Sequence, residues 1–322
     1  MNKDARIVFL GTPEFAVPVL RALVGAGYPV VGVVSQPDRP VGRKRVLAPT
    51  PVKQAAQALG LSVLQPERIR SEEALDSLAK WQPDVLVTAA YGQLIPDRVL
   101  RLPRVAALNV HASLLPRYRG ASPIQLAIME GEKETGVSIM TMVREMDAGP
   151  VWAQARLAIG QNENYGELSE RLARLGADLL LSTLPGVMTG TSTPMAQDEA
   201  AATYAPRLNR QDEWLNFHES ADRVANRVRA LAPAPGASAW LDGQAMKVWN
   251  AAPALTETVA AEPGQVIEVG ERGLLVACGK DAVWVQRVQA AGKKAMGGLE
   301  FSRGRQGLAG SVFKGQKPGD QD

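Results

Sequence analysis

The chain has 322 residues, of which 46% are hydrophobic and 21% are charged, and a formal net charge of +3. This composition is typical of a folded globular protein, and the length favours two domains. A single cysteine, Cys278, excludes an internal disulfide framework and a cysteine-based metal cluster. No apolar run approaches the roughly 20 residues of a membrane span, and residues 1–6 include Asn, Lys, Asp and Arg, unlike a signal peptide. We therefore expect a cytoplasmic protein without membrane contacts.

Short apolar runs alternate with helix-like runs between residues 6 and 142. This rhythm predicts an α/β fold with a Rossmann-like, doubly wound and mostly parallel sheet. The turn after the first strand, Gly11-Thr12-Pro13-Glu14, lacks the glycine fingerprint of a dinucleotide site, and no P-loop is present. Strands are expected at 6–10, 30–34, 62–64, 85–89 and 106–110, and helices from the first strand to about 26, at 52–59 and at 71–81.

The stretch from 107 to 125 is the centre of the predicted site. Its apolar strand ends in Asn109 and His111, and a spacing of two places both side chains on one face of an extended chain. An irregular loop with one proline and two arginines follows, and a helix-like run that contains a second proline begins at Ser122. Open α/β sheets bind ligands at such strand ends. The spacing alone leaves two interpretations: a functional pair, or a buried structural histidine beside a turn-capping asparagine.

A basic, proline-rich segment at 36–51 is longer than an ordinary strand-to-helix connection of about 2–6 residues. Residues 36–53 hold five basic residues and one acidic residue, a balance of +4. The four prolines disfavour a helix or a central strand. The segment is either a solvated loop or a loop that meets a phosphate backbone. Its candidate contacts are Arg39, Arg43, Lys44 and Arg45.

Two more strands are expected at 134–143 and 151–159, on either side of the turn Asp147-Ala148-Gly149-Pro150. Turn chemistry explains an aspartate at this position. The functional interpretation is that Asp147 delivers a carboxylate that orients His111. An amphipathic helix at 166–184 closes this part of the chain.

The composition changes between Pro185 and about Arg210, where aliphatic residues are few, as in a linker. Short strands separated by turns follow, which predicts a small β sandwich or barrel. Residues 207–322 hold 15 basic and 13 acidic residues, and Lys293-Lys294 is the clearest basic patch. We expect an N-terminal domain at 1–190, a linker at 191–208, a C-terminal domain at 209–315 and a frayed tail at 316–322. The expected elements of the C-terminal domain are a helix around 221–231 and strands at 237–241, 246–250, 264–269, 273–277 and 282–288.

Taken together, these motifs resemble those of the folate-dependent formyltransferases, and the resemblance covers nearly the whole chain. The run Ser-Leu-Leu-Pro just after an Asn and a His is its most specific signal. Ala112 stands where that family often has Gly, and residues 230–237 lack aromatic residues often seen there. The matching stretches are Gly11-Thr12-Pro13-Glu14-Phe15, residues 36–40, Ala90-Tyr91-Gly92, Asn109-Val110-His111, residues 113–120, Asp147-Ala148-Gly149, Lys247-Val248-Trp249 and residues 291–296.

The resemblance implies transfer of a formyl group from 10-formyltetrahydrofolate to the α-amino group of methionyl-initiator tRNA, without a metal. It implies that Asn109, His111 and Asp147 are catalytic, that the basic loop meets the acceptor end of the tRNA, and that Arg43 is the best single candidate there. The C-terminal domain would be a β-barrel that resembles the OB fold and helps to hold the tRNA, and we expect a monomer. The implied folate contacts are Ser113, Leu114, Leu115 and Pro116, and the implied tRNA contacts are Arg39, Arg43, Lys44, Arg45, Lys293 and Lys294.

The implied reaction requires these residue types. Attack of an amine on a formyl carbon places negative charge on oxygen, and the Asn109 amide and a protonated His111 can both donate to it. Asp147 near His111 would help to relay protons. The alternatives are a formyltransferase for glycinamide ribonucleotide or an amino-sugar nucleotide, a formyl-donor hydrolase, and a non-catalytic RNA-binding relative. The basic loop and the C-terminal domain count against the other enzymes, and the intact trio counts against the non-catalytic relative.

Overall fold

The structure, a computed structural model, describes residues 4–41, 46–254, 260–303, 305 and 307–315. The chain divides into two compact units that interleave along the sequence. The first comprises residues 1–123, 134–158 and 169–205, and the second comprises 124–133, 159–168 and 206–322. The domain limits expected from the sequence stay predictions. Arg43, Lys44, Arg45 and the expected frayed tail at 316–322 lie outside the described residues.

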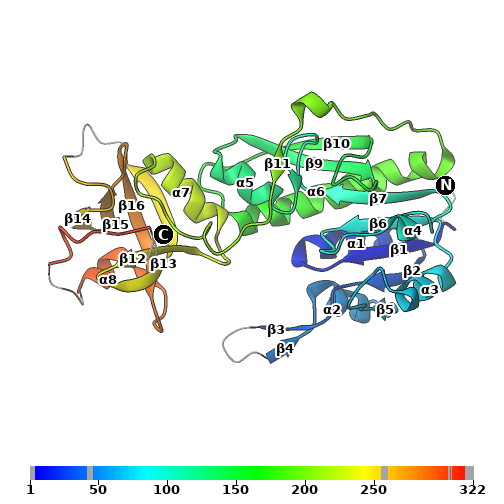
Figure 1. Cartoon of the computed structure of the whole chain (residues 1–322), viewed down its shortest axis with the longest axis horizontal. Coiled ribbons are helices and arrows are strands. Elements are labelled where there is room, and N and C mark those ends of the chain that lie inside the picture. The colour runs from blue at the N-terminus through cyan, green and yellow to red at the C-terminus, as the bar shows by residue number, and fades with distance from the viewer. Residues whose placement is uncertain (1–3, 42–45, 255–259, 304, 306, 316–322) are drawn as a thin grey trace. The chain divides into compact units, whose positions relative to one another are not determined.

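The first unit is built on a seven-stranded sheet in the order β10-β9-β7-β6-β1-β2-β5 (Figure 1). Five neighbouring strands are parallel, while β9 and β10 form an antiparallel edge. The predicted α/β class and mostly parallel sheet are therefore confirmed. The strands are β1 (Ile7–Gly11), β2 (Val30–Val34), β5 (Val63–Leu64), β6 (Val85–Ala89), β7 (Ala106–His111), β9 (Glu134–Thr141) and β10 (Val151–Ala158).

Helices cover both faces of this sheet, which explains its uninterrupted apolar strands. Val8 and Leu10 of β1 share one core cluster with Leu78 of α3 and Val99 of α4. On β7, Val110 lies against α6, where a Cβ added at Gly176 would be 2.7 Å from Val110 Cγ1. Since side chains alternate along a strand, Asn109 and His111 point to the other face. The helices are η1 (Glu14–Ala16), α1 (Val17–Gly25), α2 (Pro51–Ala58), α3 (Glu72–Lys80), α4 (Asp97–Leu100), α5 (Pro123–Met129) and α6 (Tyr165–Thr189).

The basic segment is not wholly irregular, because β3 (Arg39–Val41) and β4 (Val46–Ala48) pair as an antiparallel ribbon (Figure 1). Pro40 is tolerated because this ribbon has no third strand. At its base, Lys53 Nζ lies 2.6 Å from Asp38 Oδ2, and Gln65 Nε2 donates to Asp38 Oδ1 at 2.7 Å. The hydrogen bonds from Gln65 and Lys53 hold the pKa of Asp38 below its usual value.

The sequence predicted that the helix before Pro185 ends at residue 184, and this prediction was wrong. Helix α6 continues to Thr189 with Pro185 inside it. An interior proline removes one backbone hydrogen bond and crowds the carbonyl of the preceding turn. In the turn that follows, Thr189 Oγ1 donates to the Pro185 carbonyl oxygen at 2.9 Å.

Residues 195–205, which we call the strap, belong to the first unit. At one end, Met195 and Val151 exchange two backbone hydrogen bonds of 2.8 Å. At the other end, β11 (Tyr204–Ala205) pairs in parallel with β8 (Arg119–Gly120). A short helix, η2 (Glu199–Ala201), lies between them. The strap thus connects the edge strand β10 with the loop that follows His111.

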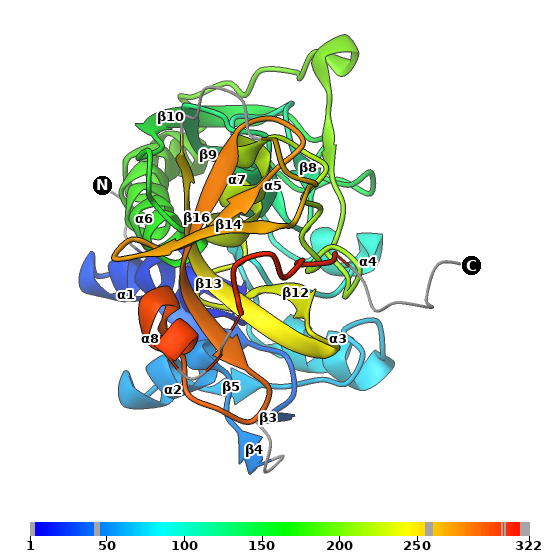
Figure 2. The ribbon, with the colours of Figure 1, turned by 90° about the vertical axis from the view of Figure 1, so that its left-hand side faces the viewer.

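The second unit contains a separate antiparallel sheet in the order β12-β13-β16-β15-β14, with β17 beside β16. Figure 2 labels strands β12, β13, β14 and β16 of this sheet. Val312 bridges Gln265 near β14, and Lys314 bridges Trp240 of β12, so the C-terminal segment joins the two edges of the sheet. The predicted β-rich C-terminal fold is confirmed. Its elements are α7 (Ala221–Ala230), β12 (Ala237–Leu241), β13 (Gln244–Ala254), β14 (Val266–Gly270), β15 (Gly273–Ala277), β16 (Ala282–Ala290), β17 (Met296–Gly297) and α8 (Gly298–Arg303).

Local sequence explains two of these elements. Helix α7 buries Ala221, Val224, Ala225 and Val228, a spacing that places them on one helical face. Asp242-Gly243 joins β12 to β13, and both residues have positive φ, +49° and +76°, as a type I′ hairpin turn requires. Over the described ranges, no helix has the length and apolar character that a membrane crossing requires.

Candidate active site

The structure brings the three predicted catalytic residues to the carboxyl end of β7. His111 ends this strand and is only 5% exposed. Its Nδ1 lies 3.7 Å from Asp147 Oδ2, although the two residues are far apart in the sequence. Asn109 lies two residues earlier on the same face of β7 and is half-buried. The functional interpretation of Asp147, a carboxylate beside His111, therefore agrees with the geometry.

Both ring nitrogens of His111 face protein atoms. Nε2 lies 3.0 Å from the backbone carbonyl oxygen of Tyr118, to which it donates, while Nδ1 faces the Asp147 carboxylate. Donation from Nε2 to a substrate oxygen therefore requires the imidazole to leave the Tyr118 carbonyl. Among the described residues, the Asn109 side chain makes no hydrogen bond, so its amide is the readier donor.

Asp147 occupies the turn between β9 and β10 with an unusual backbone. Its φ is +50°, and this left-handed conformation costs an L-residue about 1–2 kcal/mol. Asp147 Oδ2 accepts a hydrogen bond of 2.8 Å from the Gly120 N–H, and its carbonyl oxygen accepts one of 2.8 Å from Gln197 Nε2. Each such bond contributes about 0.5–1.5 kcal/mol net. Two of them are enough to offset the cost of the conformation.

The predicted folate-binding run, 113–116, is firmly anchored to β9 and β10. Ser113 is fully buried, and its Oγ donates to the Arg117 carbonyl oxygen at 2.6 Å. The Leu115 N–H donates to Ser138 Oγ at 3.1 Å, and the Leu115 carbonyl accepts from Gln154 Nε2 at 2.8 Å. The side chains of this run that are less than fully buried are those of Leu114 and Pro116.

Sequence reasoning missed two exposed apolar side chains at this end of the sheet. Leu94, in the loop after β6, is 80% exposed, and Met146, next to Asp147, is 60% exposed. The loops after β1 and β6 are also joined, because Thr12 Oγ1 donates to the Tyr91 carbonyl oxygen at 2.7 Å. The signal that could have identified Leu94 and Met146 is that each lies in the loop that follows a predicted strand.

A buried arginine follows the site loop and was also missed. Arg119 is 1% exposed, and its guanidinium donates to Glu199 of the strap at 2.7 and 2.8 Å. The hydrogen bond with Glu199 raises the pKa of Arg119, and the same contact lowers the pKa of the Glu199 carboxyl group. The pair therefore stays charged over the ordinary pH range.

The described tRNA candidates are surface residues. Arg39 makes one exposed ion pair, with Glu67 at 3.5 Å, which contributes little to stability. Lys293 and Lys294 are exposed in the turn after β16, and neither makes an ion pair with a described residue. Gln289 Nε2 holds this turn by donating to the Lys293 carbonyl oxygen at 2.8 Å.

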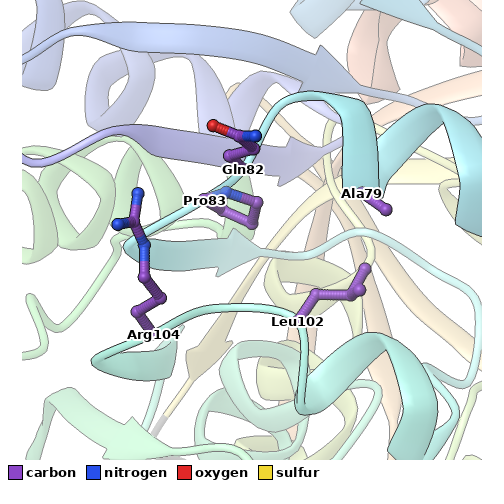
Figure 3. A pocket seen from close by; sticks show the side chains of 5 residues that line it. All are labelled: Ala79, Gln82, Pro83, Leu102 and Arg104. Atoms are coloured by element: carbon purple, nitrogen blue, oxygen red, sulfur yellow. The ribbon is translucent and has the colours of Figure 1, made fainter.

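A shallow pocket of about 380 Å³ elsewhere in the first unit is not part of this site (Figure 3). Gln82 and Pro83 precede β6, while Leu102 and Arg104 precede β7, so the pocket lies at the amino ends of these parallel strands. The catalytic candidates lie at the carboxyl ends. In the part of the chain that the structure describes, no group of three or more His, Cys, Asp or Glu side chains is arranged to hold a metal ion.

Solved structures resemble the fold over most of the chain. HypX from Aquifex aeolicus in complex with tetrahydrofolic acid has a TM-score of 0.62 and 18% identity, and the match covers 93% of this chain and 47% of HypX. WlaRD, a sugar 3N-formyl transferase solved in the presence of dTDP and 5-N-formyl-THF, has a TM-score of 0.65 and 16% identity, with 90% and 99% covered. At such identities, these similarities concern the fold alone.

Sequence comparisons establish the family as well as the fold. The methionyl-tRNA formyltransferase of Enterococcus faecalis is 45% identical over 93% of this chain and 96% of its own length. The corresponding protein of Bacillus subtilis is 46% identical, over 96% and 97%. Residues 5–184 match the formyl transferase family, and residues 207–306 match the formyl transferase C-terminal domain. The chain, with its Asn109, His111 and Asp147 cluster, therefore belongs to the formyl transferase family.

Proposed function

We propose that this protein transfers the formyl group of 10-formyltetrahydrofolate to the α-amino group of methionyl-initiator tRNA, for the initiation of translation. The observation that carries this proposal is the 45–46% identity to methionyl-tRNA formyltransferases along 93–96% of the chain. The Asn109, His111 and Asp147 cluster supports it, since it offers an uncommitted amide donor and a histidine–carboxylate pair in one place. We also propose that the protein acts in the cytoplasm as a monomer.

Asn109 has the role of stabilising negative charge on the formyl oxygen. During transfer, a bond forms between the substrate amine nitrogen and the formyl carbon, and the bond from that carbon to N10 of the folate breaks. The half-buried amide of Asn109 donates to the oxygen while it is negatively charged. This contact is strongest in the transition state, so it acts on turnover more than on substrate binding.

His111 and Asp147 have the role of moving the proton. The attacking amine loses one proton, and N10 gains one, so no net acid or base is consumed. Nδ1 of His111 and Oδ2 of Asp147 lie 3.7 Å apart, slightly beyond hydrogen-bond distance, so a small approach of the two side chains would let them pass the proton. The Tyr118 carbonyl fixes the orientation of the imidazole from its other side.

The loops around the three catalytic candidates suit the folate of the formyl donor, because its ring system is flat and partly apolar. This donor, 10-formyltetrahydrofolate, supplies the formyl group. Leu94 and Met146 offer exposed apolar surface on the two loops at this edge, and Leu114 and Pro116 complete the proposed folate-binding run with Ser113 and Leu115. Because the polar groups of Ser113 and Leu115 already have protein partners, we assign these two residues to shaping the loop.

The tRNA contacts in this proposal are electrostatic. Arg39 on the ribbon, together with Arg43, Lys44 and Arg45, would meet phosphates near the acceptor end. Lys293 and Lys294 of the second unit would meet the tRNA backbone, since they are exposed and without an ion pair to any described residue. Such contacts favour tRNA-bound methionine over free methionine.

The test is a formyl-transfer assay with three acceptors: methionyl-initiator tRNA, free methionine and glycinamide ribonucleotide. We expect formylation of the tRNA-bound methionine alone. Transfer to glycinamide ribonucleotide with none to the tRNA would overturn the proposal. Hydrolysis of the donor without transfer to any acceptor would also overturn it.

A further inference from the structure

One side-chain amide of the strap, that of Gln197, connects the two loops of the active site. Its Oε1 accepts hydrogen bonds from Arg119 Nε at 3.1 Å and Nη2 at 2.9 Å. Its Nε2 donates to the carbonyl oxygens of Asp147 at 2.8 Å and Gly149 at 2.7 Å. The amide therefore joins the arginine that follows the His111 loop to the turn that carries Asp147.

Arg119 determines which way this amide faces. Its side chain is 2% exposed, and Glu199 fixes the guanidinium by two hydrogen bonds, from Nη1 at 2.8 Å and from Nη2 at 2.7 Å. A guanidinium offers only donors, so it faces the carbonyl oxygen of Gln197 and leaves the NH₂ group for the Asp147 turn. The order of groups is thus Glu199, Arg119, Gln197 and the backbone of Asp147 and Gly149.

We propose that Arg119 and Gln197 are positioning residues that hold the Asp147 carboxylate in place beside His111. The Asp147 carbonyl is held by Gln197, and its carboxylate is held by the N–H of Gly120, the residue after Arg119. A φ of +50° at Asp147 requires contacts of this kind to persist. The inference deepens the proposed function, since it rests on Asp147 acting in formyl transfer.

The strap does not need this amide in order to stay attached. Met195 is bonded to Val151 at one end. Near the other end, Thr203 Oγ1 accepts from the Tyr118 N–H at 2.9 Å, and the Thr203 carbonyl accepts from the Arg119 N–H at 2.9 Å. A change confined to the amide therefore alters the Asp147 turn and leaves the strap in place.

Gln197→Glu is the informative substitution. It keeps the length of the side chain and an acceptor for Arg119, but it replaces the NH₂ donor by an oxygen that faces two carbonyl oxygens. We expect kcat for formyl transfer to fall about 10- to 100-fold, with the KM values for tRNA and folate within about 2-fold of wild type. The matched control is Ala196→Glu, which adds the same charge at the preceding, exposed position and should change neither constant.

A double-variant cycle separates positioning from a general structural role. If Gln197 acts through Asp147, then Gln197→Glu should change kcat by less than about 2-fold in an Asp147→Ala background. An equal proportional loss in both backgrounds would overturn the inference. So would wild-type kcat in a folded Gln197→Glu variant.

A readout without turnover completes the test. Amide hydrogen exchange at Ala148 and Gly149 should be faster in Gln197→Glu than in Ala196→Glu, and equal rates would contradict the inference. Wild-type activity on methionyl-tRNA tests the proposed function separately. If the wild type formylates a different amine, the proposed function fails, while the same variants measured with that amine still decide whether Gln197 positions Asp147.

Discussion

Gly120 donates its backbone N–H to Asp147 Oδ2 at 2.8 Å, across 27 residues of sequence. Gly120 has a φ of +120°, and a Cβ built on it would lie 2.5 Å from the Ala205 carbonyl oxygen. The strap therefore passes directly over the residue that holds the Asp147 carboxylate. Three separate segments of the chain meet at this one glycine.

Gly120→Ala should damage both stability and activity. The added methyl group must push the strap away in a backbone conformation that alanine avoids, so we expect a loss of about 1–3 kcal/mol in the free energy of unfolding. The shift also moves the donor away from Asp147, which lowers kcat. Denaturant unfolding and steady-state kinetics measure the two effects. Gly25→Ala is the control, because nothing lies within 4 Å of its added Cβ and it ends helix α1; similar results for both variants would contradict this account.

Asn109→Ala should lower turnover and leave stability almost unchanged. Loss of one donor to a developing oxyanion costs about 10²–10³ in kcat, and the Asn109 side chain has no hydrogen bond among the described residues to lose. Formylation kinetics and thermal unfolding of the same sample test this. A near-normal kcat would remove Asn109 from the mechanism.

His111→Ala should differ from Asn109→Ala by lowering stability as well as turnover. It removes the hydrogen bond that His111 Nε2 donates to the Tyr118 carbonyl oxygen, and loss of one such bond costs about 0.5–1.5 kcal/mol. We expect a lower midpoint in denaturant and a large loss of kcat, with the protein still folded in buffer. A variant as stable as the wild type would show that the Tyr118 contact contributes nothing.

Removing the candidate tRNA contacts should weaken tRNA binding alone. Arg39→Ala, Arg43→Ala and the double variant Lys293→Ala/Lys294→Ala should each raise the KM for tRNA and leave the KM for folate unchanged. Each lost phosphate contact should also flatten the dependence of log KM on log salt by about 1. Arg104→Ala is the control, since this exposed arginine lies at the opposite edge of the sheet. If Arg104→Ala raised the KM for tRNA as much as the other variants, the loss of net positive charge would explain the effect, and the proposed contacts would be contradicted.

Cys278 should be unreactive in the folded protein at pH 8. Burial, followed by the nearby Asp281, raises the pKa of its thiol to about 12. The thiolate is the reactive form, so iodoacetamide should label Cys278 only after unfolding. The unfolded chain loses this proton near pH 8.5, and the folded chain holds it to about pH 12. The contribution of Cys278 to the free energy of unfolding is therefore constant below about pH 8.5 and decreases as the pH rises above that value. Rapid labelling of the native protein at pH 8 would contradict this.

The sequence predicted what depends on local pattern. Strands β2 and β6 lie where their apolar runs are, and Asn109 and His111 share a face because side chains alternate along β7. The ribbon of β3 and β4 was not predicted, since Pro40 and its basic neighbours disfavour a strand. The two strands form because they pair with each other. The sequence also did not predict that helix α6 continues past Pro185 to Thr189, because a proline disfavours a helix interior.

The contacts that hold the site could not be predicted from local pattern. An arginine such as Arg119 is normally a surface residue, and hydrogen bonds to Glu199 and Gln197, about 80 residues away, make its burial favourable. Gln197 lies in a polar, mostly exposed segment whose composition indicates a linker. The φ of +50° at Asp147 likewise depends on distant partners rather than on its own turn.

The strap has a consequence for biosynthesis. A nascent chain that has emerged only to Thr189 contains all seven strands of the first sheet and all three catalytic candidates, but none of residues 195–205. The ribosome must add the strap before Gln197 can reach the Asp147 turn. Since the strap ends at Ala205 and the last segment of the second unit begins at Pro206, the candidate site is completed only as that segment begins to emerge from the ribosome.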